Sequence, residues 1–256
     1  MYEKEILQIV ELLHHAEYAI ALTGAGISRP SGIPDYRSPD SGLWSRHNPY
    51  EVGSIQGFRF QPARFYDWIR PLATLILNAQ PNPAHVALAR LETIGILRSV
   101  ITQNIDLLHG RAGSKTVYEV HGHIREVTCI SCFTIYPAQD FLPPFLNNDQ
   151  ADIPRCPKCG GVLKPNVILF GEQLPAQVLL RAEQDTRRAD MMIVAGSSLE
   201  VYPIADLPRR VKEHGGSLVL INLEPTSYDR MADVVIHADV ADILPRIVNQ
   251  LEGAAS

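Results

Sequence analysis

Four cysteines form two Cys-x-x-Cys pairs, Cys129/Cys132 and Cys156/Cys159, separated by 23 residues. Each pair can offer two thiolates to one ion, and four thiolates favour a tetrahedral Zn²⁺ with no open coordination position. A closed site of this kind is structural and does not activate water. The alternative is a set of redox pairs, which the lack of a thioredoxin-like context disfavours. The spacing therefore predicts one structural zinc ion.

A glycine-rich turn, Gly24-Ala25-Gly26, follows a short apolar run over residues 18–23. A backbone without Cβ atoms can approach a pyrophosphate closely. The next glycine is Gly32, so the spacing departs from G-x-G-x-x-G, and a tight turn without a ligand is the alternative. Arg37 can meet a phosphate with its planar guanidinium, or can serve only as a surface ion-pair partner.

Three polar residues, Gln103, Asn104 and Asp106, directly follow an apolar run over residues 97–102. Polar side chains at a strand end are costly to bury unless they are hydrogen-bonded. They predict hydrogen bonding to a ribose and a carboxamide, and the alternative is a capped turn. His121 ends the next apolar run, where a neutral imidazole is a suitable general base. We interpret the other histidines near motifs as structural: His85, His109 and His123.

The elements that position these residues are predicted from apolar periodicity. Residues 4–15 have the spacing of an amphipathic helix, and residues 18–23 read as a buried strand. Asn82 and Pro83 open a helix over 83–93 as N-cap and first helical residue. Further strands are predicted over 97–102, 117–120, 167–170, 191–195, 217–222 and 234–237. Further helices are predicted over 176–188, 204–214 and 239–251.

Alternating strands and helices imply a parallel sheet covered on both faces. Two stretches break the alternation, 36–80 and 122–164, and we interpret them as insertions. The predicted fold is α/β: a Rossmann-like parallel-sheet domain of residues 1–35, 81–121 and 165–256 with a small module inserted. The helical insertion 36–80 and the zinc-ribbon-like insertion 122–164 form that module, and the functional site is expected in the cleft between the two parts.

The composition is that of an ordinary globular chain. Among 256 residues, 46% are hydrophobic and 20% charged, which excludes a disordered protein. The formal net charge of −5 makes electrostatic binding of nucleic acid a poor hypothesis, and the segment 122–164 is formally neutral. We expect no signal peptide and no membrane-spanning segment, and therefore a cytoplasmic protein without a membrane partner. The oligomeric state is left open, a monomer included.

The motifs and their order resemble those of the sirtuins, the NAD-dependent protein lysine deacylases. The stretch 24–37 reads GAGISRPSGIPDYR, and 102–109 reads TQNIDLLH. Shorter matches are VHG at 120–122, FGE at 170–172, GSSL at 196–199, VYP at 201–203 and IN at 221–222. The resemblance extends over about residues 20–240. Tyr36 stands where phenylalanine is commoner and Ser197 where threonine is commoner, which leaves the affinity for NAD open.

The resemblance implies that NAD is consumed as a co-substrate. Asp106 and the Ile105 backbone would hold the nicotinamide amide, while Gln103 and Asn104 would contact the ribose or position a water molecule. His121, with Asn104, would be catalytic and would take a proton from the ribose. The implied NAD contacts are Gly24, Ala25, Gly26, Arg29, Tyr36, Arg37, Gln103, Asn104, Ile105, Asp106, Gly196, Ser197, Ser198, Asn222, Leu223 and Val240.

The partner implied by the resemblance is an acetylated-lysine protein or peptide, sandwiched as an added strand between two loops. The implied peptide contacts are Val167, Phe170, Gly171, Glu172, Val201 and Tyr202. Sirtuins that remove succinyl or malonyl groups carry a Tyr-x-x-Arg pair. Here Ile69 occupies the arginine position, and Arg70 points about 100° away on a helix. An acetyl or another uncharged acyl group is therefore expected.

The implied products are free lysine, nicotinamide and 2′-O-acyl-ADP-ribose. Three other classes of protein would share parts of this sequence pattern. A mono-ADP-ribosyltransferase would use the same NAD site and would label protein. A nicotinamide dehydrogenase is disfavoured by the missing G-x-G-x-x-G and by the lack of a hydride-acceptor site. A non-catalytic zinc-ribbon module is disfavoured by its neutral charge and by the intact polar residues.

Overall fold

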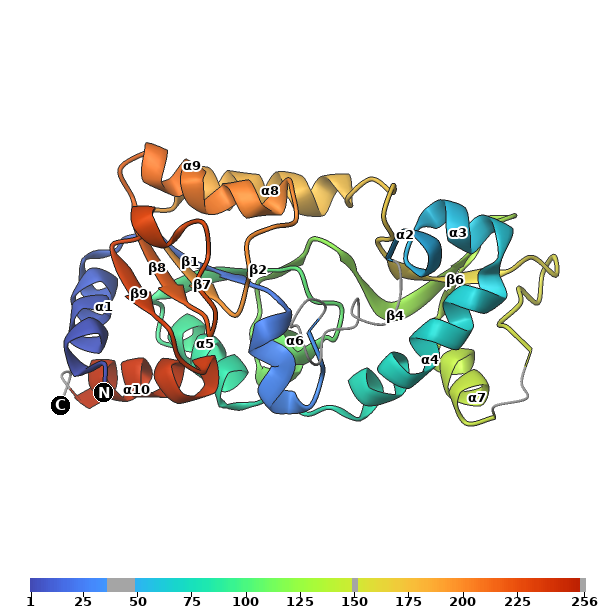
Figure 1. Ribbon diagram of the computed structural model, residues 1–256, viewed down its shortest axis with the longest axis horizontal. Helices are drawn as coiled ribbons and strands as arrows, with labels where there is room; N and C mark the ends of the chain where they lie inside the picture. Colours follow the sequence, from blue (N-terminus) through green and yellow to red (C-terminus); the bar gives the residue numbers. More distant parts are fainter. Residues whose placement is uncertain (36–48, 149–151, 254–256) are drawn as a thin grey trace.

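The computed structural model describes residues 1–35, 49–148 and 152–253. At its centre lies a six-stranded parallel sheet with the strand order β3-β2-β1-β7-β8-β9 (Figure 1). The strands are β1 Ala19–Thr23, β2 Leu97–Thr102, β3 Val117–Glu119, β7 Met191–Ala195, β8 Ser217–Ile221 and β9 Val234–Ile236. Every residue of β1 and β7 is buried, as expected of central strands covered on both faces.

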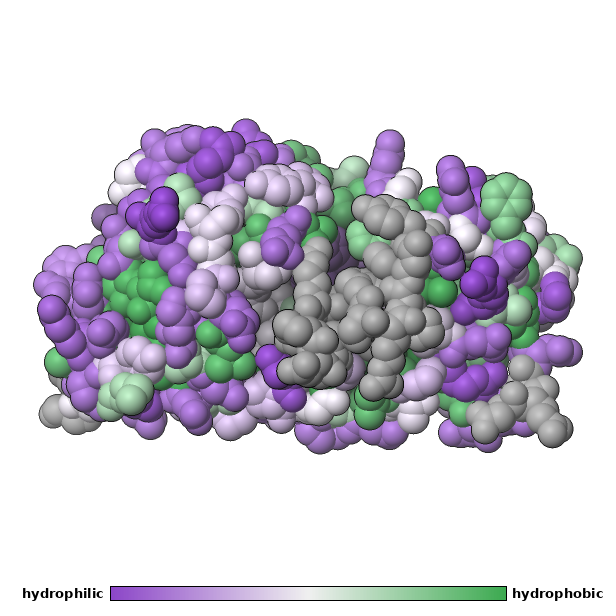
Figure 2. Space-filling view, viewed as in Figure 1, coloured by the Kyte–Doolittle hydropathy of each residue, from purple (hydrophilic) through white to green (hydrophobic). Residues whose placement is uncertain are grey.

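Two helical layers cover this sheet, one on each face (Figure 1). One layer contains α1 Glu3–His15, α5 Pro83–Thr93 and α10 Val240–Gly253. The other contains α8 Ala176–Arg188 and α9 Leu207–Glu213. Hydrophilic side chains cover the outward side of α9 (Figure 2). None of the helices in the described ranges has the length and apolarity required to cross a membrane.

A second sheet, antiparallel and three-stranded, has the order β5-β4-β6. Its strands are β4 Gly122–Cys129, β5 Ile135–Pro137 and β6 Leu163–Val167. The neighbouring helices are α2 Pro49–Val52, α3 Ile55–Phe60, α4 Pro62–Asn78 and α7 Leu142–Leu146. Residues of α3, α4 and α7 share an apolar core with this sheet, at the end of the molecule opposite the two termini (Figure 1).

The remaining short elements connect these layers. They are η1 Ala25–Ser31, α6 Leu108–Ala112, η3 Ala138–Asp140, η4 Ile204–Asp206 and η5 Asp229–Met231.

One predicted strand is wrong. The apolar run 167–170 was expected to join the parallel sheet, but β6 ends at Val167 and pairs with β4 in the antiparallel sheet. The run is apolar because Val167 and Leu169 pack into the second core. Phe170 instead makes an isolated bridge with Ser54. Apolar periodicity alone does not distinguish which core a short run faces.

Two histidines, His85 and His109, lie buried near the carboxyl end of β1. His85 belongs to the cap of α5, where Asn82 N–H donates to its Nδ1. Its ring packs edge-to-face on His109, with 4.9 Å between centroids, and His109 Nε2 hydrogen bonds with Thr23 Oγ1 at 2.9 Å. Burial lowers the pKa of His85 to about 4. Burial and the neighbouring His85 lower the pKa of His109 to about 3.

These low pKa values predict acid-sensitive folding. Between pH 6.5 and about 4, the unfolded chain protonates both imidazoles and the folded chain does not. The free energy of unfolding therefore falls as pH falls, by up to about 1.4 kcal/mol per pH unit for each histidine. Urea unfolding of wild type and His109→Gln from pH 7.5 to 5 measures this, because carboxylate contributions cancel in the comparison. The exposed His14→Gln is the control, and equal pH slopes for wild type and His109→Gln would contradict the prediction.

Candidate active site and zinc site

A cavity of about 860 Å³ lies at the carboxyl ends of the parallel strands. The residues that directly follow β1, β2, β7 and β8 all line it: Gly24, Gln103, Gly196 and Asn222. Residues of the second core, among them Phe65 and Val167, line it from the other side. Ligands of open α/β sheets bind at this edge, so the cavity has the position of a ligand site.

The turn after β1 touches the turn after β7 backbone to backbone. Gly26 N–H donates to Gly196 O at 2.8 Å, and a Cβ on Gly26 would lie only 2.8 Å from Gly196 Cα. A Cβ on Gly24 would lie 2.9 Å from Gly196 O, and Gly196 itself has φ +63°. These glycines are therefore required by the contact between the two turns, which leaves a backbone floor without side chains.

A buried polar network lies under this floor. Asp106 accepts hydrogen bonds from Ser28 Oγ at 2.6 Å and from Leu108 N–H at 2.9 Å. Asn104 Nδ2 donates to Gly24 O at 3.0 Å and to Ser28 Oγ at 3.1 Å. Burial raises the pKa of Asp106, and the two hydrogen bonds it accepts oppose that rise. Asp106 does not line the cavity, whereas Asn104 and Ile105 do.

Ser197 connects two loops at the cavity. Its Oγ accepts hydrogen bonds from Gln103 Nε2 at 3.0 Å and from Leu199 N–H at 3.3 Å. Leu199 is buried and has φ 55°, a left-handed conformation that is uncommon for leucine. Because the oxygen is the acceptor in both bonds, the Ser197 hydroxyl retains its own proton to donate.

His121 lies between two parts of the cavity. Its Nδ1 donates to Gln103 O at 3.2 Å, since a carbonyl oxygen only accepts, and this leaves the lone pair on Nε2. Burial lowers the pKa of His121, and the bond to Gln103 opposes this. The backbone oxygen of His121 accepts from Ile168 N–H at 2.8 Å. The imidazole is therefore held as a neutral group with one basic nitrogen near neutral pH.

Two connecting segments also line the cavity, 167–172 throughout and 198–202 except for the buried Leu199. Phe170 is anchored to the stretch before α3, because its N–H donates to Gly53 O at 2.9 Å and its oxygen accepts from Ile55 N–H at 3.0 Å. The predicted site residues that line the cavity are Gly24, Ala25, Gly26, Arg29, Gln103, Asn104, Ile105, His121, Val167, Phe170, Gly171, Glu172, Gly196, Ser197, Ser198, Val201, Tyr202, Asn222, Leu223 and Val240. Tyr36 and Arg37 lie outside the described residues.

Helix α4 supplies an apolar wall made of Phe65, Trp68 and Ile69. Tyr66 and Arg70 do not line the cavity. Tyr66 Oη donates to Leu163 O at 2.5 Å, and Arg70 donates to Phe145 O while its guanidinium lies 3.7 Å from the Phe145 ring centroid. The side chains that α4 contributes to the cavity are thus uncharged.

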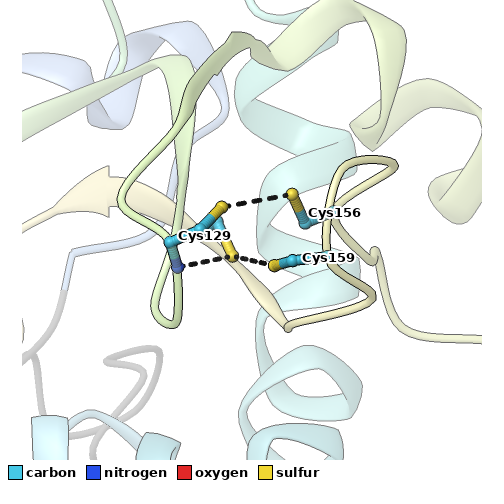
Figure 3. A group of neighbouring side chains, drawn as sticks. Cys129, Cys156 and Cys159 are labelled. Carbon is cyan, nitrogen blue, oxygen red and sulfur yellow. Dashed lines mark hydrogen bonds between the residues drawn. The ribbon is translucent and has the colours of Figure 1, made fainter.

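The four cysteines meet at the end of β4, with all four sulfur atoms within 4.8 Å of one another. Figure 3 shows the sulfurs of Cys129, Cys156 and Cys159 turned toward a common centre. The distance from Cys129 Sγ to Cys159 Sγ is 3.5 Å, and that from Cys132 Sγ to Cys156 Sγ is 3.7 Å. Zn–S bonds of about 2.3 Å place tetrahedral sulfurs about 3.8 Å apart, so the cluster fits one zinc ion with no open position.

Comparison with known proteins identifies the family. The Sir2 family model matches residues 24–203. The chain belongs to the Sir2 family. It is 48% identical to an NAD-dependent protein deacetylase of Caldivirga maquilingensis, over 94% of this chain and 92% of the relative. It is 43% identical to NAD-dependent protein deacylase 2 of Archaeoglobus fulgidus, over 98% of this chain and 97% of the relative.

Solved Sir2 structures have the same fold. One, described under "Structural Basis for the Mechanism and Regulation of Sir2 Enzymes", gives a TM-score of 0.92 at 43% identity, covering 98% of this chain and 99% of the other. Another, a Sir2–p53 peptide–NAD⁺ complex, gives a TM-score of 0.87 at 40% identity, covering 97% and 98%.

Sequence reasoning missed three features of this Sir2-family site. Ser28 was quoted within a motif but not named as a site residue, although it connects Asn104 and Asp106. The apolar wall of Phe65 and Trp68 was also missed, because aromatic residues at helical spacing are usually core residues. Lys164, which is buried, entered only the charge balance of residues 122–164. The motif at 24–37 could have pointed to Ser28, whereas no sequence signal separates Phe65, Trp68 and Lys164 from ordinary packing or charge.

The cysteine cluster predicts that zinc is required for folding of this part of the chain. We expect one zinc per chain, and we expect Cys129→Ser to lose it. Zinc at about 1,000 times its dissociation constant contributes about 4 kcal/mol to the free energy of unfolding, which the variant would lose. Metal analysis and thermal unfolding measure this, with Ser131→Ala in the same knuckle as control. A variant that keeps one zinc and the wild-type melting temperature would contradict the prediction.

Proposed function

We propose that this Sir2-family chain is an NAD-dependent protein lysine deacetylase that gives free lysine, nicotinamide and 2′-O-acyl-ADP-ribose. The observation that carries the proposal is the position of His121. Its ring bonds to Gln103, in the polar group after β2, and its carbonyl bonds to Ile168, in the segment 167–172. One basic imidazole is thereby joined to a nucleotide subsite and to a peptide subsite.

The residues at the strand ends suit NAD. The glycine floor admits a pyrophosphate close to the backbone. Although Asp106 lies outside the lining of the cavity, each of its oxygens accepts one bond and has a second lone pair, which suits the amide N–H of a carboxamide bound beside Ile105. When bound, NAD supplies a ribose carbon that carries nicotinamide as its leaving group. Asn222, Leu223 and Val240 bound the far part of the same cavity.

His121 and Asn104 would act on the ribose hydroxyls. Nε2 of the neutral His121 takes a proton from a hydroxyl, and the Nδ1 bond to Gln103 keeps the ring oriented while it does so. Asn104 uses its amide N–H groups on Gly24 and Ser28, which leaves its oxygen to orient a hydroxyl or a water molecule. Both residues therefore serve proton transfer at the sugar.

The acetyl-lysine would enter between the segments 167–172 and 198–202, as a strand added between them. The apolar wall of Phe65, Trp68 and Ile69 favours an uncharged acyl group. A carboxylate beside this wall would be buried with no cation from α4, because Arg70 is engaged with Phe145. We place the protein in the cytoplasm, where a reducing environment keeps four thiolates available for zinc.

Replacing His121 by Ala tests the proton transfer. We expect kcat for deacetylation of an acetyl-lysine peptide to fall by about 10²–10⁴-fold. Mass spectrometry of nicotinamide and acyl-ADP-ribose, with NAD and peptide as substrates, follows the reaction. His123→Ala, two positions along the chain and outside the cavity, is the matched control. Turnover by His121→Ala at the wild-type rate would remove the residue from the mechanism, and NAD label on protein instead of on a released acyl group would favour ADP-ribosyl transfer.

The pH profile follows from the lowered pKa of His121. Only the neutral imidazole accepts a proton, and burial shifts its protonation to below pH 6.5. We expect kcat/KM to be level above pH 6.5 and to fall by about tenfold per pH unit below the folded-state pKa. Initial rates from pH 5 to 8.5, corrected for stability at each pH, measure this, and an acid limb centred above pH 6.5 would contradict it.

Acyl preference is the third expectation. Wild type should process acetyl-lysine at least about tenfold faster than succinyl-lysine in kcat/KM, because an unpaired buried carboxylate is strongly disfavoured. Ile69→Arg should raise succinyl turnover by providing a cation at the wall, whereas the control Ile69→Met should not. Faster succinyl than acetyl turnover by wild type would show that this interpretation of the wall is wrong.

A further inference from the structure

Lys164 is a buried lysine that does not line the cavity. It lies on β6, and its side chain runs behind the segment 167–172 that forms one side of the cavity. Its relative exposure is 9%, whereas most lysines keep their ammonium in water. Burial lowers its pKa, and the carboxylate of Glu172 opposes this. A charge in such a place requires a specific set of partners.

The ammonium has three hydrogens, and three oxygens surround it. Lys164 Nζ donates to Val167 O at 2.7 Å, to Glu172 Oε2 at 2.9 Å and to Pro165 O at 3.2 Å. Glu172 Oε2 also accepts from Leu169 N–H at 2.8 Å, and Glu172 N–H donates to Leu169 O at 3.0 Å. Lys164 thus holds both ends of the segment, Val167 through its carbonyl and Glu172 through its carboxylate, and Glu172 in turn holds Leu169.

Other bonds use most of the remaining backbone groups of this segment. Ile168 N–H is taken by His121, and both backbone groups of Phe170 are taken by residues 53–55. The Val167 carbonyl points toward the buried Lys164 ammonium. Because successive carbonyls of an extended chain point to opposite sides, the Ile168 carbonyl points away from Lys164. Among the described residues, the Ile168 carbonyl has no protein partner and belongs to a residue that lines the cavity.

We propose that Lys164 is a positioning residue for peptide binding: through the Val167 carbonyl and the Glu172 carboxylate it fixes the geometry in which the segment 167–172 lines the cavity. The inference rests on the proposed function, since it specifies how the peptide side of that site is held. Without the ammonium, the Val167 carbonyl and the Glu172 carboxylate lose a buried charged donor, and both turn toward water. The segment then loses the fixed geometry that strand addition needs.

Lys164→Met tests the proposal, because methionine keeps the length of the side chain and removes the charge. We expect KM for the acetyl-lysine peptide to rise by roughly tenfold, while KM for NAD changes by less than about twofold. Fluorescence anisotropy with a labelled acetyl-lysine peptide should show the same loss of affinity. A purely structural defect would move both KM values together. An unchanged peptide KM, or equal increases in the two KM values, overturns the proposal.

Glu172→Gln is the second variant and keeps an oxygen for Leu169 N–H. It should raise the peptide KM by roughly threefold, and its effect should not add to that of Lys164→Met in the double variant. If Lys164→Met fails to fold, the peptide KM of Glu172→Gln is the deciding measurement, and an unchanged value overturns the proposal. Lys212→Met, which removes an ammonium paired with Asp233 away from the cavity, is the matched control and should leave both KM values within twofold.

The wild-type protein separates the two hypotheses. If wild type binds the labelled peptide but yields no acyl-ADP-ribose, the proposed function fails, and the anisotropy series still tests Lys164. If wild type turns over acetyl-lysine and Lys164→Met binds the peptide as tightly as wild type, only the role of Lys164 fails.

Discussion

The backbone contact between the turns after β1 and β7 is the constraint on which the site depends. A parallel sheet brings the carboxyl ends of its strands to one edge, so the turns that follow them must share a small space. The backbones of Gly26 and Gly196 pack directly against each other, at a separation that a Cβ on Gly26 would not permit. The polar residues after β2 then lie beneath the contact, where Asn104 bonds to Gly24 O. The nucleotide subsite is thus a consequence of sheet packing as well as of ligand chemistry.

Burial divides the histidines into structural and chemical groups. His85 and His109 have no opening to the cavity, so their low pKa values serve only to keep them neutral within the core. His121 has the same direction of shift but lines the cavity, and a single Nδ1 bond leaves Nε2 available. The same side chain therefore supports packing in one environment and keeps an accessible basic nitrogen in another. Access to the cavity and the hydrogen bonds of the ring, more than the direction of the pKa shift, distinguish His121 from His85 and His109.

The sequence predicted the parallel sheet and the zinc cluster well, because both depend on local patterns. Helices 83–93 and 176–188 and strands 97–102 and 191–195 begin and end where the structure has them. The run 167–170 was misassigned, since its apolar residues face a second core that no local pattern reveals. The wall of α4 was missed for a similar reason: whether Trp68 faces a core or a cavity depends on tertiary packing. Roles of individual site residues remain predictions drawn from the family resemblance.

His121 occupies a place where the chain crosses between the two sheets. β3 ends at Glu119 and β4 begins at Gly122, so His121 lies in the outgoing connection, and Ile168 begins the returning one after β6. The bond from Ile168 N–H to His121 O joins the two crossings. Any movement of the antiparallel sheet relative to the parallel sheet would therefore act on both residues together.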